Sequence, residues 1–147
     1  MLYADDLTPD DMFDLGTWTP TAEEIMDFGR QWDPQPFHVD EAAAAETPIG
    51  GLFASGIHGL AILQRLKVLG FYGRTAVIAG KGMTDGRFLK PIRPGVPLRG
   101  RLEVLAVETR DDGRAVVTTR GSLHDPDDEL VLQLTGRGLF AARPDVA

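Results

Sequence analysis

The residues best suited to proton transfer lie in a short run that contains two prolines. Asp33 and His38 are five positions apart, and Pro34 and Pro36 stiffen the path between them. A stiff, non-helical turn can hold a carboxylate and an imidazole on the same side of a pocket, which suits general acid–base work on one bound water. The structural alternative is that Asp33 caps a turn and His38 packs beside Phe37.

The two remaining histidines give weaker signals. His58 lies in the first turn of an expected helix, where it either lines the same pocket or forms a polar rim to an apolar helix. His124 precedes an acidic turn, and we expect a surface histidine there. His38 and Asp40 also match half of an iron-binding facial triad with His124 as the distal ligand. We disfavour that alternative because such oxygenases use a double-stranded β-helix without an intervening buried helix.

The elements around this run predict a helix followed by strands. Residues 13–18 form a candidate strand, and Thr21 with Glu24 forms a capping box for a helix that places Ile25, Phe28 and Trp32 on one face. The two prolines end that helix, and Asp40 can cap a short helix over residues 41–46.

Residues 57–69 predict the dominant helix. Its apolar residues lie nearly all round, so we expect a sheet to wrap it and bury it on all sides. Everything after Gly70 predicts strands, with Asp112-Gly113 as a hairpin turn between residues 101–109 and 114–124, and a last strand over 130–140. The predicted class is α+β, with an antiparallel sheet around one long central helix.

Composition bounds the function. The chain has 147 residues, a net charge of −7 and no cysteine, which disfavours nonspecific nucleic-acid binding and excludes disulfides and thiolate metal sites. It contains no apolar run of membrane-spanning length and no secretion signal at its start, so we expect a cytoplasmic protein without a membrane partner. Residues 86–102 hold five basic residues and no acidic one, so this segment is either an anion-binding site or a solvated loop.

Three blocks of the sequence together resemble the MaoC-like hydratase family. Residues 28–41 resemble its D-x-N-P-x-H-x-D-E signature, residues 50–58 the entry to its central helix, and residues 87–100 its RF-x-x-P-V-x-P-G-D-x-L turn. The resemblance covers about residues 13–140 and implies a single hot-dog domain over residues 1–147. Four departures stand out: Gln35 for Asn, Ser55 for His, Val96 for Asp, and residues 30–32 for the usual Ser-Gly.

The resemblance also implies a reaction. We expect reversible hydration of 2-enoyl thioesters, with Asp33 and His38 as the acid–base pair and the Gly56 N–H stabilising charge on the thioester carbonyl. Gln35, Ser55 and His58 would contact the substrate, and Lys90 and Arg93 would meet the CoA phosphates. No metal or redox cofactor is expected, and the active form would be a homodimer or a higher homo-oligomer.

Two other functions fit the same fold. One is an acyl-CoA thioesterase, which also uses a carboxylate and a helix N-terminus. The other is a non-catalytic subunit that binds acyl thioesters, since a fold does not fix a function. The spacing of Asp33 and His38 favours hydration, and the choice between CoA and acyl carrier protein stays open.

Overall fold

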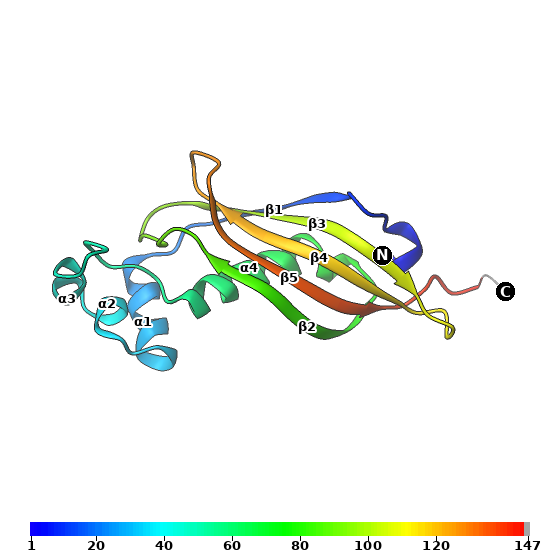
Figure 1. Ribbon diagram of the computed structural model, residues 1–147, viewed down its shortest axis with the longest axis horizontal. Helices are drawn as coiled ribbons and strands as arrows, with labels where there is room; N and C mark the ends of the chain where they lie inside the picture. The colour runs from blue at the N-terminus through cyan, green and yellow to red at the C-terminus, as the bar shows by residue number, and fades with distance from the viewer. Residues whose placement is uncertain (146–147) are drawn as a thin grey trace.

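A five-stranded antiparallel sheet with one long helix across a single face forms the body of the computed structural model, which describes residues 1–145 (Figure 1). The strands lie in the order β1-β3-β4-β5-β2. The elements in chain order are η1 (Ala4–Asp6), β1 (Met12–Trp18), α1 (Ala22–Trp32), α2 (Pro36–Val39), α3 (Glu41–Ala45), α4 (Gly56–Gly70), η2 (Tyr72–Arg74), β2 (Val77–Phe88), β3 (Leu98–Thr109), β4 (Ala115–His124) and β5 (Leu130–Phe140). This is the α+β hot-dog arrangement that the sequence predicted.

Buried and more exposed side chains alternate along much of the central strands. β3, β4 and β5 form a meander in which every second side chain faces the helix, and Gly113, with φ of 80°, turns the β3–β4 hairpin as expected. Glycines on this face let α4 approach the sheet closely. A Cβ added at Gly100 or Gly121 would lie 3.0–3.3 Å from the side chains of Leu66 and Leu63.

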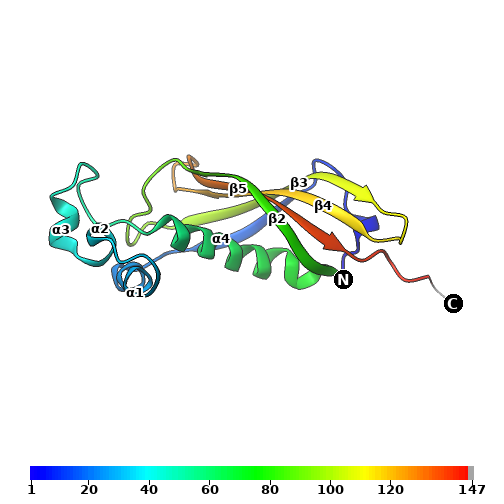
Figure 2. The same cartoon turned by 60° about the horizontal axis from the view of Figure 1, so that its bottom comes forward.

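The expectation that α4 is buried on all sides is wrong. Ile62, Leu63 and Leu66 face the sheet and are buried, whereas Ile57 and Leu69 point outward and Leu69 is 65% exposed. Figure 2 shows α4 lying beneath the sheet with its other side uncovered. A five-stranded sheet curves over only one side of a helix, so the outer apolar residues have no covering from residues 1–145.

Strand β2 forms one edge of the sheet. Among the residues that the structure describes, it pairs only with β5, and all twelve of its residues are exposed. The register shifts three times along the pairing, and Asp85 adopts a positive φ of 52° at one of these irregularities. The outer backbone edge of β2 is therefore open to another strand.

Helices α1, α2 and α3 gather at one end of the molecule, beside the N-terminus of α4 (Figure 1). Thr21 caps α1 by accepting from the Glu24 amide at 3.1 Å, as predicted, but the Glu24 carboxylate accepts from the indole of Trp18. Trp32 is 70% exposed, so the predicted apolar face of α1 ends before it. Pro36 begins the unpredicted helix α2, because proline fits the first position of a helix.

Candidate active site

Asp33 and His38 come together at the junction of α1 and α2. Asp33 is the C-cap of α1, and His38 lies within α2 and is only 4% exposed. The two helices pack closely because Gly29 has no side chain: a Cβ there would lie 2.9 Å from the carbonyl oxygen of His38. Nε2 of His38 is 3.4 Å from Oδ2 of Asp33.

The backbone fixes which nitrogen of His38 is basic. Nδ1 lies 2.7 Å from the carbonyl oxygen of Phe53, and a carbonyl only accepts, so Nδ1 carries the proton. The free lone pair of neutral His38 is then on Nε2, the atom that faces Asp33. The rings of Phe37 and Phe53 meet the imidazole edge-on at 4.6 and 4.8 Å and hold its orientation.

Two polar neighbours keep Asp33 ionised. The Ser55 hydroxyl donates to Oδ2 at 2.6 Å, and the Gln35 amide donates to Oδ1 at 2.8 Å. These hydrogen bonds, with the Ser55 bond first and a smaller contribution from His38, lower the pKa of the Asp33 carboxyl below its ordinary value. Gln35, expected to contact the substrate, thus lines the cleft and also holds Asp33.

The N-terminus of α4 lies against the same residues. Ser55 is its N-cap and also accepts from the Ile57 amide at 3.2 Å. Gly56 follows as the first helical residue, and an amide in this turn has no acceptor within the helix and a favourable dipole. A Cβ at Gly56 would lie 2.8 Å from the ring of Phe88, so glycine is what allows that ring to cover the helix end.

These groups, except Ser55, line one cleft of about 410 Å³. Ser55 was expected to contact the substrate, but it is fully buried and is not one of the residues that line the cleft. Asp33, Gln35, His38 and Gly56 supply its polar side. Its apolar walls come from the loop after α3, the end of β2 with the loop that follows it, and the start of β5, and they include Phe53, Phe88, Leu89, Ile92, Val131 and Leu132. A pocket with mostly apolar walls and a few convergent polar groups is typical of a small-molecule site.

His58 does not line this cleft. It stacks on Phe28 with a centroid distance of 4.6 Å and borders a separate hollow between α1 and α4. Burial lowers the pKa of His58, which favours its neutral form. The first turn of α4 thus places Gly56 at the cleft and directs the His58 side chain into the separate hollow.

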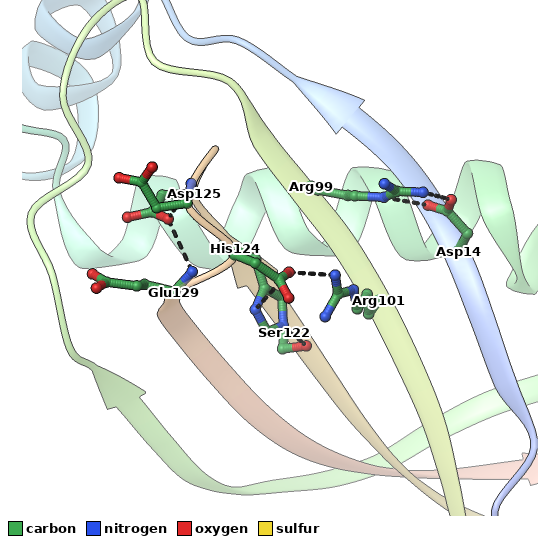
Figure 3. A network of polar contacts seen from close by, with 9 residues as sticks. Asp14, Arg99, Arg101, Ser122, His124, Asp125 and Glu129 are labelled. Carbon is green, nitrogen blue, oxygen red and sulfur yellow. Dashed lines mark hydrogen bonds and ion pairs between the residues drawn. The ribbon is translucent and has the colours of Figure 1, made fainter.

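The basic segment is largely engaged by the protein itself. Lys90 lies at the edge of the cleft and pairs with Asp125 at 2.7 Å and with Glu129, contacts that raise its pKa. Arg93 lies outside the cleft and donates to the backbone carbonyls of Gly51 and Ile49. The arginines of strand β3 are also paired within the protein (Figure 3). Arg99 pairs with Asp14, and Arg101 pairs with Asp128 in the turn after His124.

The iron-site alternative finds no support in residues 1–145, where no group of three His, Asp or Glu side chains is placed to hold a metal ion. His124 instead lies on β4 beside the Ser122 hydroxyl, 3.0 Å from it (Figure 3). Over the same residues, no helix is both long and apolar enough to cross a membrane.

Sequence reasoning missed four contributors to the site. The Phe53 carbonyl, Phe88 and the start of β5 act on the cleft from distant parts of the chain, and Gly29 acts from within α1. Only Gly29 left a signal, since a glycine inside a helix commonly marks close packing. The others depend on contacts that no local pattern predicts.

Comparison with known proteins decides the family, because the model of the MaoC like domain matches residues 7–125. The chain belongs to the MaoC-like family. A crystal structure of a MaoC-like dehydratase from Rhodospirillum rubrum superposes with a TM-score of 0.90 at 35% identity, covering 99% of this chain and all of that one. The uncharacterized protein YdeM of Bacillus subtilis is 32% identical over 130 residues, covering 88% of this chain and 92% of that protein.

More distant structures share the fold. The R-hydratase PhaJ1 from Pseudomonas aeruginosa, unliganded, superposes on this MaoC-like chain with a TM-score of 0.72 at 22% identity, covering 99% of this chain and 92% of that one. At that identity the likeness establishes the hot-dog fold and leaves the reaction to the geometry of the site.

Proposed function

We propose that this MaoC-like protein catalyses the reversible hydration of 2-enoyl thioesters to 3-hydroxyacyl thioesters. The observation that carries the proposal is the convergence of the Asp33–His38 pair and the Gly56 amide on one apolar cleft. The pair can hold and deprotonate a water, and the helix end can stabilise an oxyanion. An apolar cleft suits the acyl chain.

The chemistry follows from the placement of the atoms. A water within hydrogen-bond reach of both Nε2 of His38 and Oδ2 of Asp33 loses a proton to the pair as its oxygen adds to the β-carbon of the enoyl group. Negative charge then moves onto the thioester oxygen, where the Gly56 N–H donates to it. Return of a proton to the α-carbon completes the addition. Because the two groups are coupled, the proton on each belongs to the pair. These steps require neither a metal nor a redox group.

We propose CoA as the carrier of the acyl group. Lys90 is the basic residue at the edge of the cleft, but it already serves two carboxylates. To bind Lys90, a CoA phosphate must replace the two carboxylates, and the lysine is exposed to solvent, so the net gain is small. Lys90→Ala should therefore weaken acyl-CoA binding by only a few-fold. Arg93 is committed to backbone carbonyls and should contribute through the loop that it holds.

We propose a homodimer that forms through strand β2. Its edge is open along its length, and exposed Val77, Ile78 and Met83 lie on it. Light scattering after gel filtration measures the mass in solution. A proline at Ile78 should lower that mass to the monomer's if β2 is the contact, because proline removes a donor from the edge.

The test of the reaction follows the enoyl-thioester absorbance of crotonyl-CoA and of a longer 2-enoyl-CoA, with free thiol measured in the same samples. Asp33→Asn and His38→Ala should each lower kcat by roughly 100-fold or more. His124→Ala is the matched histidine control and should keep wild-type activity.

Each other outcome assigns a different function. Thiol release without loss of the double bond would make the protein a thioesterase. Binding of acyl-CoA without turnover of any thioester would make it a non-catalytic subunit. Hydration that persists in folded Asp33→Asn and His38→Ala would overturn the assignment of this cleft.

A further inference from the structure

The loop between α3 and α4 supplies a partner to each member of the acid–base pair. The Phe53 carbonyl accepts from Nδ1 of His38 at 2.7 Å, and the Ser55 hydroxyl donates to Asp33 at 2.6 Å. The stretch that holds both groups, residues 46–55, belongs to no helix or strand. Its position therefore depends on hydrogen bonds to other parts of the chain.

Arg93 is the side chain that holds this loop. Its Nη1 donates to the carbonyl oxygen of Gly51 at 2.9 Å and to that of Leu52 at 3.4 Å, and its Nη2 donates to that of Ile49. Hydrogen bonds from a charged donor are stronger than neutral ones, and a planar guanidinium can serve several acceptors at once. Among the salt bridges of residues 1–145, none includes Arg93, so its partner is the backbone of the loop.

A glycine allows this close contact. Gly51 has a positive φ of 154°, and a Cβ there would lie 3.1 Å from Nη1 of Arg93. The chain then turns into the core, where Leu52 and Ala54 are both buried. The guanidinium thus binds the loop where it enters the core, directly before Phe53.

The segment that carries Arg93 is itself fixed on both sides. The Ile92 carbonyl accepts from the Ala54 amide at 2.9 Å, and the Gly95 amide donates to the Pro20 carbonyl at 2.8 Å. Pro20 lies directly before the N-cap of α1, the helix whose C-cap is the aspartate of the acid–base pair. The loop and α1 are therefore fixed relative to each other through this segment.

The tautomer of His38 depends on this arrangement. If the Phe53 carbonyl moves away, the buried Nδ1–H loses its acceptor, and the tautomer with its proton on Nε2 becomes relatively more stable. Nε2 lies 3.4 Å from Oδ2 of Asp33, and once protonated it has no lone pair to accept a proton from water. A displaced loop would therefore disable the base without removing it.

We propose that Arg93 is a positioning residue, which sets the tautomer of His38 through the loop that it holds and does not bind the phosphates of the substrate. This inference rests on the proposed hydratase function and adds the residue that prepares its base. It replaces the contact with the CoA phosphates that the sequence predicted for Arg93.

The kinetic test compares crotonyl-CoA with crotonyl-pantetheine, which lacks the phosphates. Arg93→Met has no donor, so kcat should fall by roughly 10-fold on both substrates while KM stays within a few-fold. Arg93→Lys keeps the charge but cannot serve three carbonyls, so it should lose less. Arg114→Met is the matched control and should keep wild-type kcat, because Arg114 pairs with Asp112 in the β3–β4 hairpin. A loss confined to crotonyl-CoA would make Arg93 a phosphate ligand and overturn the inference.

A spectroscopic measurement separates this inference from the reaction. Long-range proton–nitrogen correlation spectra distinguish the two neutral tautomers of His38, and the signals of His124 serve as the internal reference. Wild type should carry the proton on Nδ1, and Arg93→Met should shift the population toward the Nε2 form. That result supports the role of Arg93 even if neither substrate is hydrated, which would overturn only the hydratase function.

The second variant keeps the test decisive. If Arg93→Met does not fold, Arg93→Lys must show the same change of tautomer in a weaker form. An unchanged His38 tautomer in a folded variant would overturn the inference.

Discussion

Ser55 joins Asp33 to the N-terminus of α4 through a single hydroxyl. Its Oγ donates to Oδ2 of Asp33 at 2.6 Å and accepts from the Ile57 amide at 3.2 Å. The acid–base group and the helix end proposed to hold the oxyanion are therefore fixed relative to each other by one buried side chain. This relationship gives the first prediction.

Ser55→Ala should impair catalysis at low pH in particular. Loss of the hydroxyl removes the main cause of the lowered pKa of Asp33, so the acidic limb of kcat/KM against pH should move upward. Ser55→Thr retains the hydroxyl and is the control. An unchanged acidic limb in a folded Ser55→Ala protein would show that Asp33 does not set it.

The same substitution should lower the free energy of unfolding, by about 1 kcal/mol from the lost helix cap alone. The Asp33 carboxyl, whose pKa is lowered on folding, adds stability above its unfolded pKa and loses it as the pH falls through the folded value. The difference between wild type and Ser55→Ala should therefore shrink in acid. Urea unfolding near neutral pH and near pH 3 measures it; a difference that widens in acid would contradict this linkage.

Gly56→Ala should reduce activity more than stability. The new Cβ meets the far end of the Phe88 ring at 2.8 Å, and that ring is exposed enough to move away. The displaced ring would alter the cleft wall next to the proposed oxyanion donor, so kcat/KM should fall by roughly 10-fold or more. The double variant Gly56→Ala with Phe88→Ala should recover part of the loss. If the double variant is no more active than Gly56→Ala, displacement of the Phe88 ring is not the cause of the loss.

Gly29→Ala should destabilise the protein and disturb His38. Its Cβ would lie 2.9 Å from a backbone oxygen, which cannot yield as a side-chain tip does, so we expect a cost of about 1–3 kcal/mol. Gly80→Ala is a matched control, because a Cβ there meets nothing within 4 Å. Thermal unfolding of both variants tests this, and equal midpoints would refute the tight α1–α2 contact.

Lys67→Met should raise the free energy of unfolding at neutral pH, on the order of 1 kcal/mol. The pKa of Lys67 is lowered on folding, so the cost of burying the charged amine is present below the folded pKa and disappears as the pH rises past the unfolded value near 10.5. The advantage of the variant should therefore be full below the folded pKa of Lys67 and vanish as the pH rises past the unfolded value near 10.5. A gap that grows with pH would mean that the amine is stabilised by a partner in the folded protein.

Local sequence patterns were sufficient for most of the elements and for the proximity of Asp33 and His38. Proline spacing placed Asp33 and His38 on a short stiff path, glycine and aspartate marked the caps and the hairpin, and alternation marked the strands β3 to β5. These features depend on backbone sterics and on neighbours within a few residues, so one sequence carries them. The family resemblance then ordered them into the hot-dog fold.

Tertiary structure alone decided what surrounds the pair. The Phe53 carbonyl that sets the His38 tautomer, the Phe88 ring over Gly56, and the separation of His58 from the cleft all depend on how α4 crosses the sheet. The same crossing leaves one side of α4 bare and buries Lys67 on the other. Periodicity reports that a residue is apolar or polar, but which partner it meets is fixed by packing between segments far apart in the chain.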